Sequence, residues 1–399
     1  MNSRDLQRIK RPFFYDCVIE DKEIYFPLAN YNALCRGDLM SHQVEIVNIF
    51  PDSSTNAVAA YTGIYKYENY LLLSPHPKKE KKEFLIYDSK INHFFELENN
   101  EKADFRCKSV FERDGFLYLI SIHKPGITKI SMQNFSVKYF RCPEGLRTDE
   151  RIAEILKVDN YIFIPLNMQR ILLVFNLECE EFEYYEFPKE ITSISTLAFY
   201  NDMFWITNEG NRILSWNIKL DTVEIHEKFP DDIKLFYPRN DWFLNSAIEN
   251  NELWLFPGYA DCILKFNLLT KQYEQIKFIN EEEHDEKVQE ELKLGILGRF
   301  FPSKYGTVKK IDHVIFCLSS KTRILYEIDI EKNAVKRHDF CIKNVYNGKL
   351  YPISADGIAS EENYRNGPES LIESLGKQSG DMVKNCLDEN GIKIYSLFK

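Results

Sequence analysis

The sequence lacks the local signatures that most often reveal a function. Its nine cysteines include no CxxC or other close pair, so the pattern indicates neither a zinc site nor a disulfide framework. No apolar run approaches the roughly 20 residues that span a bilayer. Residues 1–11 are polar and basic, without the apolar core of a secretory signal. We therefore expect a cytoplasmic chain that engages no membrane and for which no cofactor is predicted.

Positive charge is scarce as well. The 51 Lys and Arg residues are outnumbered by 61 Asp and Glu, and the net charge is −10. Non-specific nucleic-acid binding requires Lys and Arg to neutralise phosphates, so we expect no nucleic-acid partner. Hydrophobic residues make up 44% of the chain, and 29 Phe with 23 Tyr dominate its aromatics. This composition supplies a large core and favours strands over helices.

A short apolar, strand-like segment recurs seven times along the chain. Its copies are 24–26, 71–73, 117–119, 162–164, 204–206, 253–255 and 314–316. The first five steps between copies are 42–49 residues long, and only the last is longer, at 61 residues. Repeats of roughly 40–50 residues are typical of propeller blades.

Two turn markers recur in phase with this segment. The first precedes each copy and is rich in Asp and Asn: Asp21, Glu68, Asp114, Asp159, Asn201, Asn250 and Asp312. The second follows an apolar run about 14 residues after each copy begins: Asp38, Asp88, Ser131, Asn176, Asn217, Asn267 and Asp329. Evenly spaced strands also build sandwiches and barrels. The phased markers instead predict an all-β fold, a seven-bladed β-propeller of four-stranded antiparallel blades over residues 12–343.

The segments outside this repeat are harder to interpret. Residues 1–11 form an N-terminal segment. Residues 344–399 form a C-terminal extension that we expect to be partly helical and packed on the propeller, because apolar residues recur at 3–4 spacing between 370 and 387. The long last step reflects an acidic insertion at 280–302, which reads as a short helix. It suits either a lid over the propeller or a solvated insertion.

The fifth copy carries a family resemblance. From Phe204 to Ile213 it reads FWITNEGNRI, which resembles the blade motif WFT-x-x-x-GN-x-I of virginiamycin B lyase-type propellers. NHL and SMP-30-like propellers share this layout, which is kelch-like in architecture although the kelch double glycine is absent. The resemblance implies seven blades and, in the lyases, His and Glu side chains with Mg²⁺ at one mouth of the ring. No histidine here falls at a matching position, so no catalytic residue and no metal ligand is carried over.

The predicted strand order gives each blade two different ends. Both marked hairpins lie at one end, the uniform face, whereas the second-to-third loops and blade-to-blade connections lie at the other, the variable face. Varied loops on a rigid scaffold are typical of binding sites. The candidate ligand-binding residues on the variable face are His76, His123, Arg170, Glu209, Arg212, Tyr237, Arg239, Trp242, Tyr259, Asp261, Lys321 and Arg323.

These candidates allow both functional and structural interpretations. Arg170, Arg212 and Arg323 share one repeat position and suit an anionic ligand, or else they pair with acids of neighbouring blades. His76 and His123 occupy nearly equivalent positions, suitable for acid–base or metal chemistry or simply for exposed loops. The aromatic–basic segment 236–242 suits stacking on a ligand or packing over the ring.

We therefore expect a non-catalytic, monomeric binding propeller that presents its variable face to a protein, a peptide or a small anionic ligand. One alternative is a metal-assisted lyase or hydrolase with a site at the ring mouth, and Mg²⁺ enters only under that alternative. Another is a carbohydrate-recognition propeller that uses Tyr237, Trp242 and Tyr259.

Overall fold

The computed structural model describes most of the repeat region. The described residues are 12, 14–28, 32–51, 61–75, 83–98, 101, 103–121, 126–146, 154–208, 211–235, 242–277, 305–319, 324–332, 334–342, 345–346 and 349–350. The N-terminal segment 1–11, the acidic insertion 280–302 and the predicted helix at 370–387 lie outside them. The chain divides into two compact units, unit 1 (1–98, 322–325 and 336–399) and unit 2 (99–321 and 326–335).

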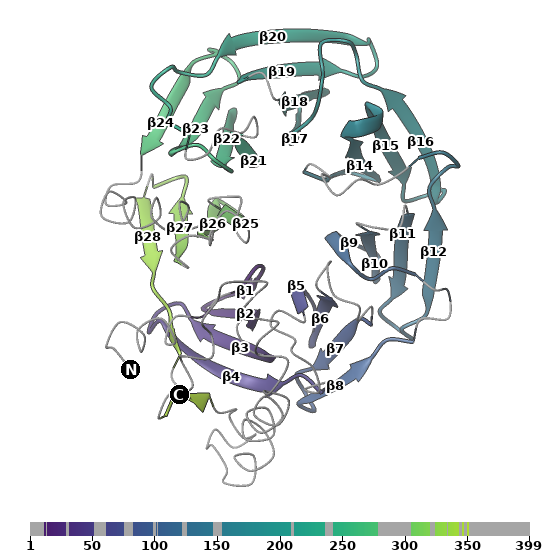
Figure 1. The fold of residues 1–399 in the computed structure, drawn as a ribbon, viewed down its shortest axis with the longest axis vertical. Helices are drawn as coiled ribbons and strands as arrows, with labels where there is room; N and C mark the ends of the chain where they lie inside the picture. The colour runs from purple at the N-terminus through teal and green to yellow at the C-terminus, as the bar shows by residue number, and fades with distance from the viewer. Residues whose placement is uncertain are drawn as a thin grey trace, which may run out of the picture. The chain divides into compact units, whose positions relative to one another are not determined.

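The fold is an all-β, seven-bladed β-propeller of mostly four-stranded antiparallel blades, as predicted (Figure 1). Blade 1 contains β1 (Val18–Glu20), β2 (Glu23–Leu28), β3 (Ala33–Asp38) and β4 (Gln43–Ile49). Blade 2 contains β5 (Tyr61–Tyr67), β6 (Tyr70–Pro75), β7 (Leu85–Asp88) and β8 (His93–Glu96). Blade 3 contains β9 (Cys107–Arg113), β10 (Phe116–Ser121), β11 (Gly126–Ser131) and β12 (Val137–Arg141).

The remaining blades repeat the same order. Blade 4 contains β13 (Leu156–Val158), β14 (Tyr161–Leu166), β15 (Ile171–Asn176) and β16 (Glu181–Glu186). Blade 5 contains β17 (Thr196–Tyr200), β18 (Met203–Thr207), β19 (Arg212–Asn217) and β20 (Thr222–Lys228). Blade 6 contains β21 (Phe243–Glu249), β22 (Glu252–Pro257), β23 (Cys262–Asn267) and β24 (Tyr273–Lys277). Blade 7 contains β25 (Tyr305–Ile311), β26 (Val314–Ser319), β27 (Leu325–Asp329) and β28 (Ala334–His338).

The recurring apolar segment is the second strand of every blade, which confirms the predicted repeat. The turn marker before it lies at the hairpin tip, and each marker residue has a positive φ of 47–52°: Asp21, Glu68, Asp114, Asp159, Asn201, Asn250 and Asp312. In blades 5 and 6 the next tip residue, Asp202 or Asn251, also has positive φ. Asp and Asn tolerate this left-handed backbone better than other non-glycine residues, which explains their recurrence at these tips.

The second marker is the last residue of every third strand, and in all copies except Ser131 its side chain accepts hydrogen bonds from the turn that follows. In blade 5, Asn217 Oδ1 accepts hydrogen bonds from the backbone N–H groups of Lys219 and Leu220, both at 3.1 Å. In blade 6, Asn267 Oδ1 accepts from Leu269 and Thr270 at 3.0 and 2.8 Å. These local bonds account for the conserved choice of a short amide or carboxylate among the copies.

The two hairpins of a blade are also joined to each other. In blade 6 the backbone N–H of Leu268 donates to the carbonyl of Asn251 at 2.8 Å, and in blade 4 Leu177 donates to Asn160 at 2.8 Å. Both hairpins therefore lie at the same end of the blade, and the second-to-third loop lies at the opposite end. The strands of every blade pair in sequence order, so the predicted placement of both hairpins at one end of the blade is confirmed.

Blade 1 has a fifth strand that the repeat pattern does not reveal. Directly after β28, the short strand β29 (Cys341–Ile342) pairs in parallel with β4, with Cys341 opposite Gln43 and Ile342 opposite Val44. The backbone N–H of Cys341 donates to the carbonyl of His42 at 2.9 Å. The end of the repeat region thus returns to the outer edge of the first blade. A two-stranded sheet, β30 (Val345–Tyr346) with β31 (Lys349–Leu350), follows.

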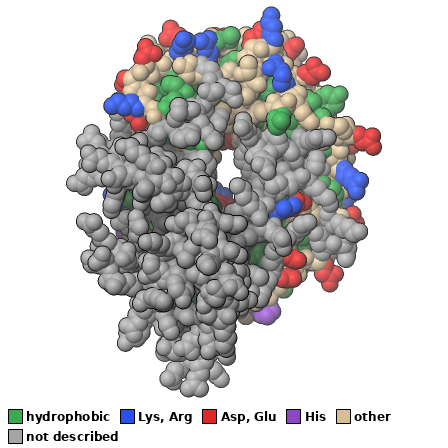
Figure 2. Space-filling view, viewed as in Figure 1, with side chains coloured by type: hydrophobic (Ala, Val, Ile, Leu, Met, Phe, Trp, Pro, Cys, Tyr) green, Lys and Arg blue, Asp and Glu red, His purple; other side chains and the backbone are tan. Residues whose placement is uncertain are grey.

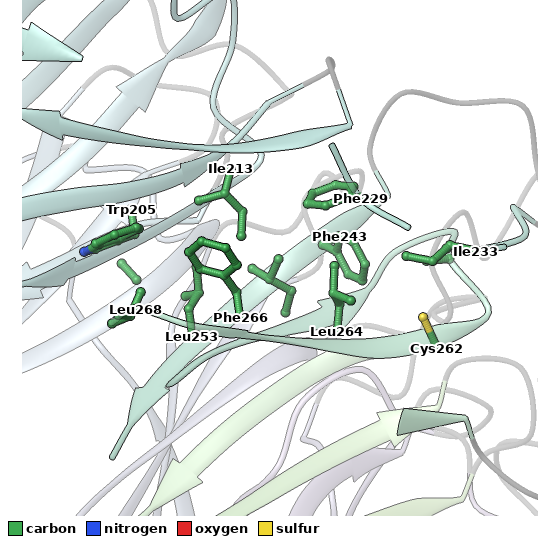
Figure 3. Packing of buried hydrophobic residues seen from close by; sticks show 13 residues of the cluster. Trp205, Ile213, Phe229, Ile233, Phe243, Leu253, Cys262, Leu264, Phe266 and Leu268 are labelled. Atoms are coloured by element: carbon green, nitrogen blue, oxygen red, sulfur yellow. The ribbon is translucent and has the colours of Figure 1, made fainter. Parts of the chain in front are cut away.

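The core lies between neighbouring blades. In unit 2, Trp205 and Ile213 of blade 5 pack with Leu253, Leu264 and Phe266 of blade 6 (Figure 3). Each of these side chains alternates with residues that face the other side of its sheet, so a blade buries apolar side chains on both faces. This packing explains why the second and third strands read as nearly continuous apolar runs.

Candidate functional site

Several polar side chains in the described part of the variable face bind the chain's own backbone. Arg170 follows the single-turn helix η1 (Asn167–Gln169) and has a positive φ of 55°. Its guanidinium donates from Nη2 to the carbonyl of Pro188 at 3.1 Å, and its own carbonyl accepts the N–H of Phe187 at 2.7 Å. The predicted anion-binding arginine of blade 4 is therefore anchored to the end of its blade's outer strand.

Asn167 makes a second anchor in the same loop. Its Nδ2 donates to the carbonyl of Ile194, and its Oδ1 accepts the N–H of Ile194, both at 2.8 Å. This paired amide contact ties the second-to-third loop of blade 4 to the connection that leads into blade 5. Residues 27 positions apart are thereby held in one geometry.

Glu154 makes three hydrogen bonds at this end of the blades. It lies two residues before β13, and its carboxylate accepts the backbone N–H groups of Leu197 at 3.1 Å and Ser246 at 3.0 Å. The hydroxyl of Ser246 also donates to it, at 2.6 Å. One carboxylate thus joins strand β17 of blade 5 and strand β21 of blade 6 to the start of blade 4, through three donors.

An equivalent acid occurs in blade 1. Asp16 also lies two residues before its first strand, and its Oδ2 accepts the N–H of Ile64, in the first strand of blade 2, at 3.2 Å. Its Oδ1 accepts the N–H of Cys17 at 2.9 Å. Neither acid is among the site residues predicted from the sequence. The sequence does contain a pattern that could have revealed them. Each acid lies two residues before the first strand of its blade, at the same position of the repeat.

Trp242, Tyr259 and Asp261 are brought together in blade 6. The carbonyl of Trp242 accepts the N–H groups of Gly258, Tyr259 and Ala260 at 3.0–3.2 Å. The Trp242 ring is half-buried, with its centroid 5.7 Å from that of Phe229, and Tyr259 is only 6% exposed. Trp242 therefore packs against Phe229, and Tyr259 is almost wholly buried.

Asp261 fixes the same loop from the other side. Its Oδ1 accepts the N–H of Lys234 at 3.1 Å, and its own N–H donates to the carbonyl of Lys234 at 3.0 Å. Arg212 begins strand β19 and is half-buried. Burial raises the pKa of the nearby Tyr273 hydroxyl, and the charge of Arg212 opposes that rise.

The other sequence-predicted site residues lie outside the described residues. These are His76, His123, Glu209, Tyr237, Arg239, Lys321 and Arg323. Within the described part of the chain, no group of three or more His, Cys, Asp or Glu side chains has an arrangement that would hold a metal ion. No helix among those residues is long and apolar enough to cross a membrane.

Comparisons with known proteins identify the fold. No protein-family model and no curated protein sequence matches the chain. Virginiamycin B lyase from Staphylococcus aureus is structurally similar, with a TM-score of 0.54 and 13% identity over 78% of this chain and 93% of the lyase. A catalytically inactive variant of that lyase with quinupristin also has a TM-score of 0.54 and 13% identity, over 80% and 94% of the two chains.

A computationally designed protein, Ika8, has the same kind of fold. Its TM-score is 0.51 at 10% identity, over 83% of this chain and 88% of the designed protein. At such low identities the likeness shows the fold alone. The chain is therefore a seven-bladed β-propeller similar in structure to virginiamycin B lyase and to a designed propeller.

Proposed function

We propose that this protein is a non-catalytic binding propeller whose variable face binds a protein, a peptide or a small anionic ligand. In this proposal it acts as a cytoplasmic monomer. The observation that carries the proposal is the anchoring of the variable end by four side chains. Asn167, Arg170 and Asp261 bind backbone groups of loops or connections, and Glu154 binds the backbone of the first strands of blades 5 and 6.

Such anchoring favours recognition. A loop that is already held in one conformation loses less entropy when a partner binds, so the contacts it makes contribute more to affinity. The described polar groups hold loop backbones in place, and the arginines at the shared repeat position add cationic groups suited to carboxylates. Among the described residues, Arg212 makes no hydrogen bond to a loop carbonyl like that of Arg170, so its charge is the better placed to meet an anionic partner.

A comparison of three full-length proteins tests the proposal. The first is the wild type, and the second is the variable-face variant Arg170→Ala/Arg212→Ala/Arg323→Ala. The third is a uniform-face control, Lys22→Ala/Lys90→Ala/Lys219→Ala, which removes the same charge at hairpin tips. Each protein is immobilised and used to capture proteins from a lysate, and the bound proteins are quantified by mass spectrometry.

We expect at least one protein to be retained by the wild type and the control but lost by the variable-face variant. That protein is then purified and titrated against all three chains. Circular dichroism and thermal unfolding verify that the variants fold, because Arg170→Ala removes the hydrogen bond to Pro188. Equal retention by all three proteins would contradict the assignment of binding to the variable face.

A further inference from the structure

The outer edges of the blades provide a second, independent surface. The fourth strand of a blade has no neighbour on its outer side unless another segment covers it. Such an edge exposes backbone N–H and C=O groups that are able to pair with a foreign strand. Proteins commonly protect edges of this kind by making them short or by placing Lys on them.

Most of the outer strands here are protected in one of these two ways. Strand β8 is only four residues long. Basic residues occur in β12, β20, β24 and β28: Lys138, Arg141, Lys228, Lys277, Lys336 and Arg337. On the part of the surface that Figure 2 shows for the described residues, Lys and Arg lie interspersed with Asp and Glu.

Two longer outer strands contain neither Lys nor Arg. They are β4, with the sequence QVEIVNI, and β16, with the sequence EFEYYE. The edge of β4 is covered, because β29 pairs with it in parallel as a fifth strand. The chain therefore already shows that an unprotected outer strand of this propeller accepts an added strand.

Strand β16 has the same kind of edge without a cover. Among the described residues it pairs only with β15, so its outer side has no strand partner (Figure 1). Phe182 anchors the strand inward, with its ring 4.8 Å from that of Phe175. Tyr184 and Tyr185 are 53% and 38% exposed, an aromatic pair of the kind enriched in interfaces.

The charge along β16 is uniformly negative. Glu181, Glu183 and Glu186 are exposed, and no described Lys or Arg lies within ion-pair distance of them. The neighbouring Glu180 differs, because it pairs with both Lys129 and Lys138. Successive side chains alternate between the two sides of the strand, so Glu181 and Glu183 share one side and Glu186 lies on the other. An added strand would meet acidic groups on both sides.

We propose that β16 is a docking edge for an extended basic segment of a partner protein, which adds to blade 4 as a fifth strand. Backbone pairing with β16 supplies the alignment, the glutamates select Lys and Arg, and Tyr184 and Tyr185 contact the apolar parts of the added strand. A second copy of this chain is a poorer occupant, because two β16 edges would place like charges opposite each other. This surface is separate from the variable face.

A model peptide tests this docking edge with the full-length protein. The probe is a fluorescein-labelled decapeptide of alternating Lys and Val, titrated by fluorescence anisotropy. A second peptide has the same charge but Pro in place of two central Val residues, which prevents strand pairing. The test variant is Glu183→Lys/Glu186→Lys. The matched control is Glu224→Lys/Glu227→Lys on β20, which has exposed glutamates at the same spacing.

We expect Glu183→Lys/Glu186→Lys to weaken binding by at least about tenfold, which corresponds to the loss of two favourable charge contacts and the gain of repulsion. The β20 control should bind like the wild type, and the Pro peptide should bind at least about tenfold more weakly than the Lys–Val peptide. Hydrogen–deuterium exchange should slow at residues 181–186 when the Lys–Val peptide is bound.

Four results would overturn the proposal. Equal weakening in both variants would show attraction to the overall negative charge rather than to β16. Equal affinity for the Pro peptide, or unchanged exchange at residues 181–186, would exclude strand addition. A dimer of the free protein that protects these residues, detected by sedimentation and exchange, would assign the edge to a second copy instead. The Arg170, Arg212 and Arg323 positions are unchanged in these variants, so failure here leaves the proposed variable-face function standing.

Discussion

The two ends of a blade are built in different ways. At the uniform end, the same residue types do the same work in every copy: an Asp, Asn or Glu at a hairpin tip with positive φ, and an Asp, Asn or Ser where the third strand ends. At the variable end, the acids Asp16 and Glu154 share one repeat position, but the loop anchors differ: blade 4 uses the amide of Asn167 and blade 6 the carboxylate of Asp261. The turns of the uniform end are therefore repeated, whereas the loop anchors of these two blades are not.

The contacts at the two ends also differ in their range along the chain. Asn217 binds backbone groups only two and three residues away. Glu154 instead binds Ser246, 92 residues away, and Asn167 binds Ile194, 27 residues away. A hairpin turn therefore forms from a few neighbouring residues, whereas the variable end takes shape only when several blades have assembled. A change of one long-range anchor therefore leaves the local hydrogen bonds of each hairpin turn in place.

The largest effect is expected from removing the main long-range anchor. Glu154→Ala deletes the acceptor for three donors and leaves the N–H groups of Leu197 and Ser246 without that partner. Because hydrogen bonds to a charged group are the stronger ones, we expect the free energy of unfolding to fall by about 2–3 kcal/mol. Urea unfolding followed by circular dichroism measures the change.

The matched control is Glu186→Ala, which removes an exposed carboxylate from the outer strand β16 and should change stability by less than about 0.5 kcal/mol. A Glu154→Ala protein as stable as this control would show that the variable end is not held together by its long-range bonds. The long-range hydrogen bonds of the variable end would then contribute little to the free energy of unfolding.

A reciprocal exchange at the hairpin tips tests the uniform end. Glu68 is the only glutamate among the seven tip markers, and it adopts a φ of 49° that Asn tolerates better. We expect Glu68→Asn to raise stability by about 0.5–1 kcal/mol. The reverse change in blade 6, Asn250→Glu, should lower it by a similar amount because Asn250 also has a φ of 49°. Thermal unfolding of both variants measures whether the first change raises stability and the second lowers it.

Both tip side chains are exposed, so packing does not differ between these variants. Two shifts of the same sign would mean that contacts other than the left-handed backbone decide the residue at the tip. The hairpin tips would then share a sequence pattern without sharing one physical cause.

The smallest effect concerns His226, in the blade body between the two ends. Its ring is 8% exposed and stacks on Trp205 with centroids 5.2 Å apart, and Nε2 lies 3.0 Å from Ser215 Oγ. Burial lowers the pKa of His226 below its usual value of 6.5, opposed by Glu224 and assisted by Lys271. The unfolded chain therefore binds the proton more readily than the folded chain.

The stability contributed by neutral His226 is present above about pH 6.5 and is lost as the pH falls through that value toward the lowered folded pKa. We expect the unfolding midpoint of the wild type to decline between pH 7.5 and 5.5 more steeply than that of His226→Gln, which keeps a polar partner for Ser215. Parallel declines in the two proteins would show that other groups control stability in this pH range.

The sequence alone predicted the repeat with accuracy. All seven second strands and both turn markers lie where the pattern placed them, because alternating apolar residues and short turn side chains report on local backbone geometry. The polarity of each blade followed from the same markers. The sequence also supplied the resemblance to virginiamycin B lyase-type propellers, which the structural likeness matches at the level of the fold.

The missed features share one property, which is that their partners are distant in the sequence. Nothing near Cys341 indicates that β29 pairs with β4, about 300 residues away, in the parallel arrangement that covers blade 1. Likewise, the repeat position of Arg170 suits either an anionic ligand or a structural partner, and its contact with the carbonyl of Pro188 appears only once β15 and β16 are paired. Periodicity records which residues face inward, but it does not record which loop a polar side chain will reach.

By itself, the sequence determined the number of blades, the position of each strand and the residues at each hairpin tip, since these depend on interactions between residues a few positions apart. The tertiary structure alone decided how Glu154 joins three blades, which outer strand β29 covers, and that β16 has no described strand on its outer side. Those outcomes depend on assembled blades that bring distant backbone groups within hydrogen-bonding distance, and no local pattern encodes that distance.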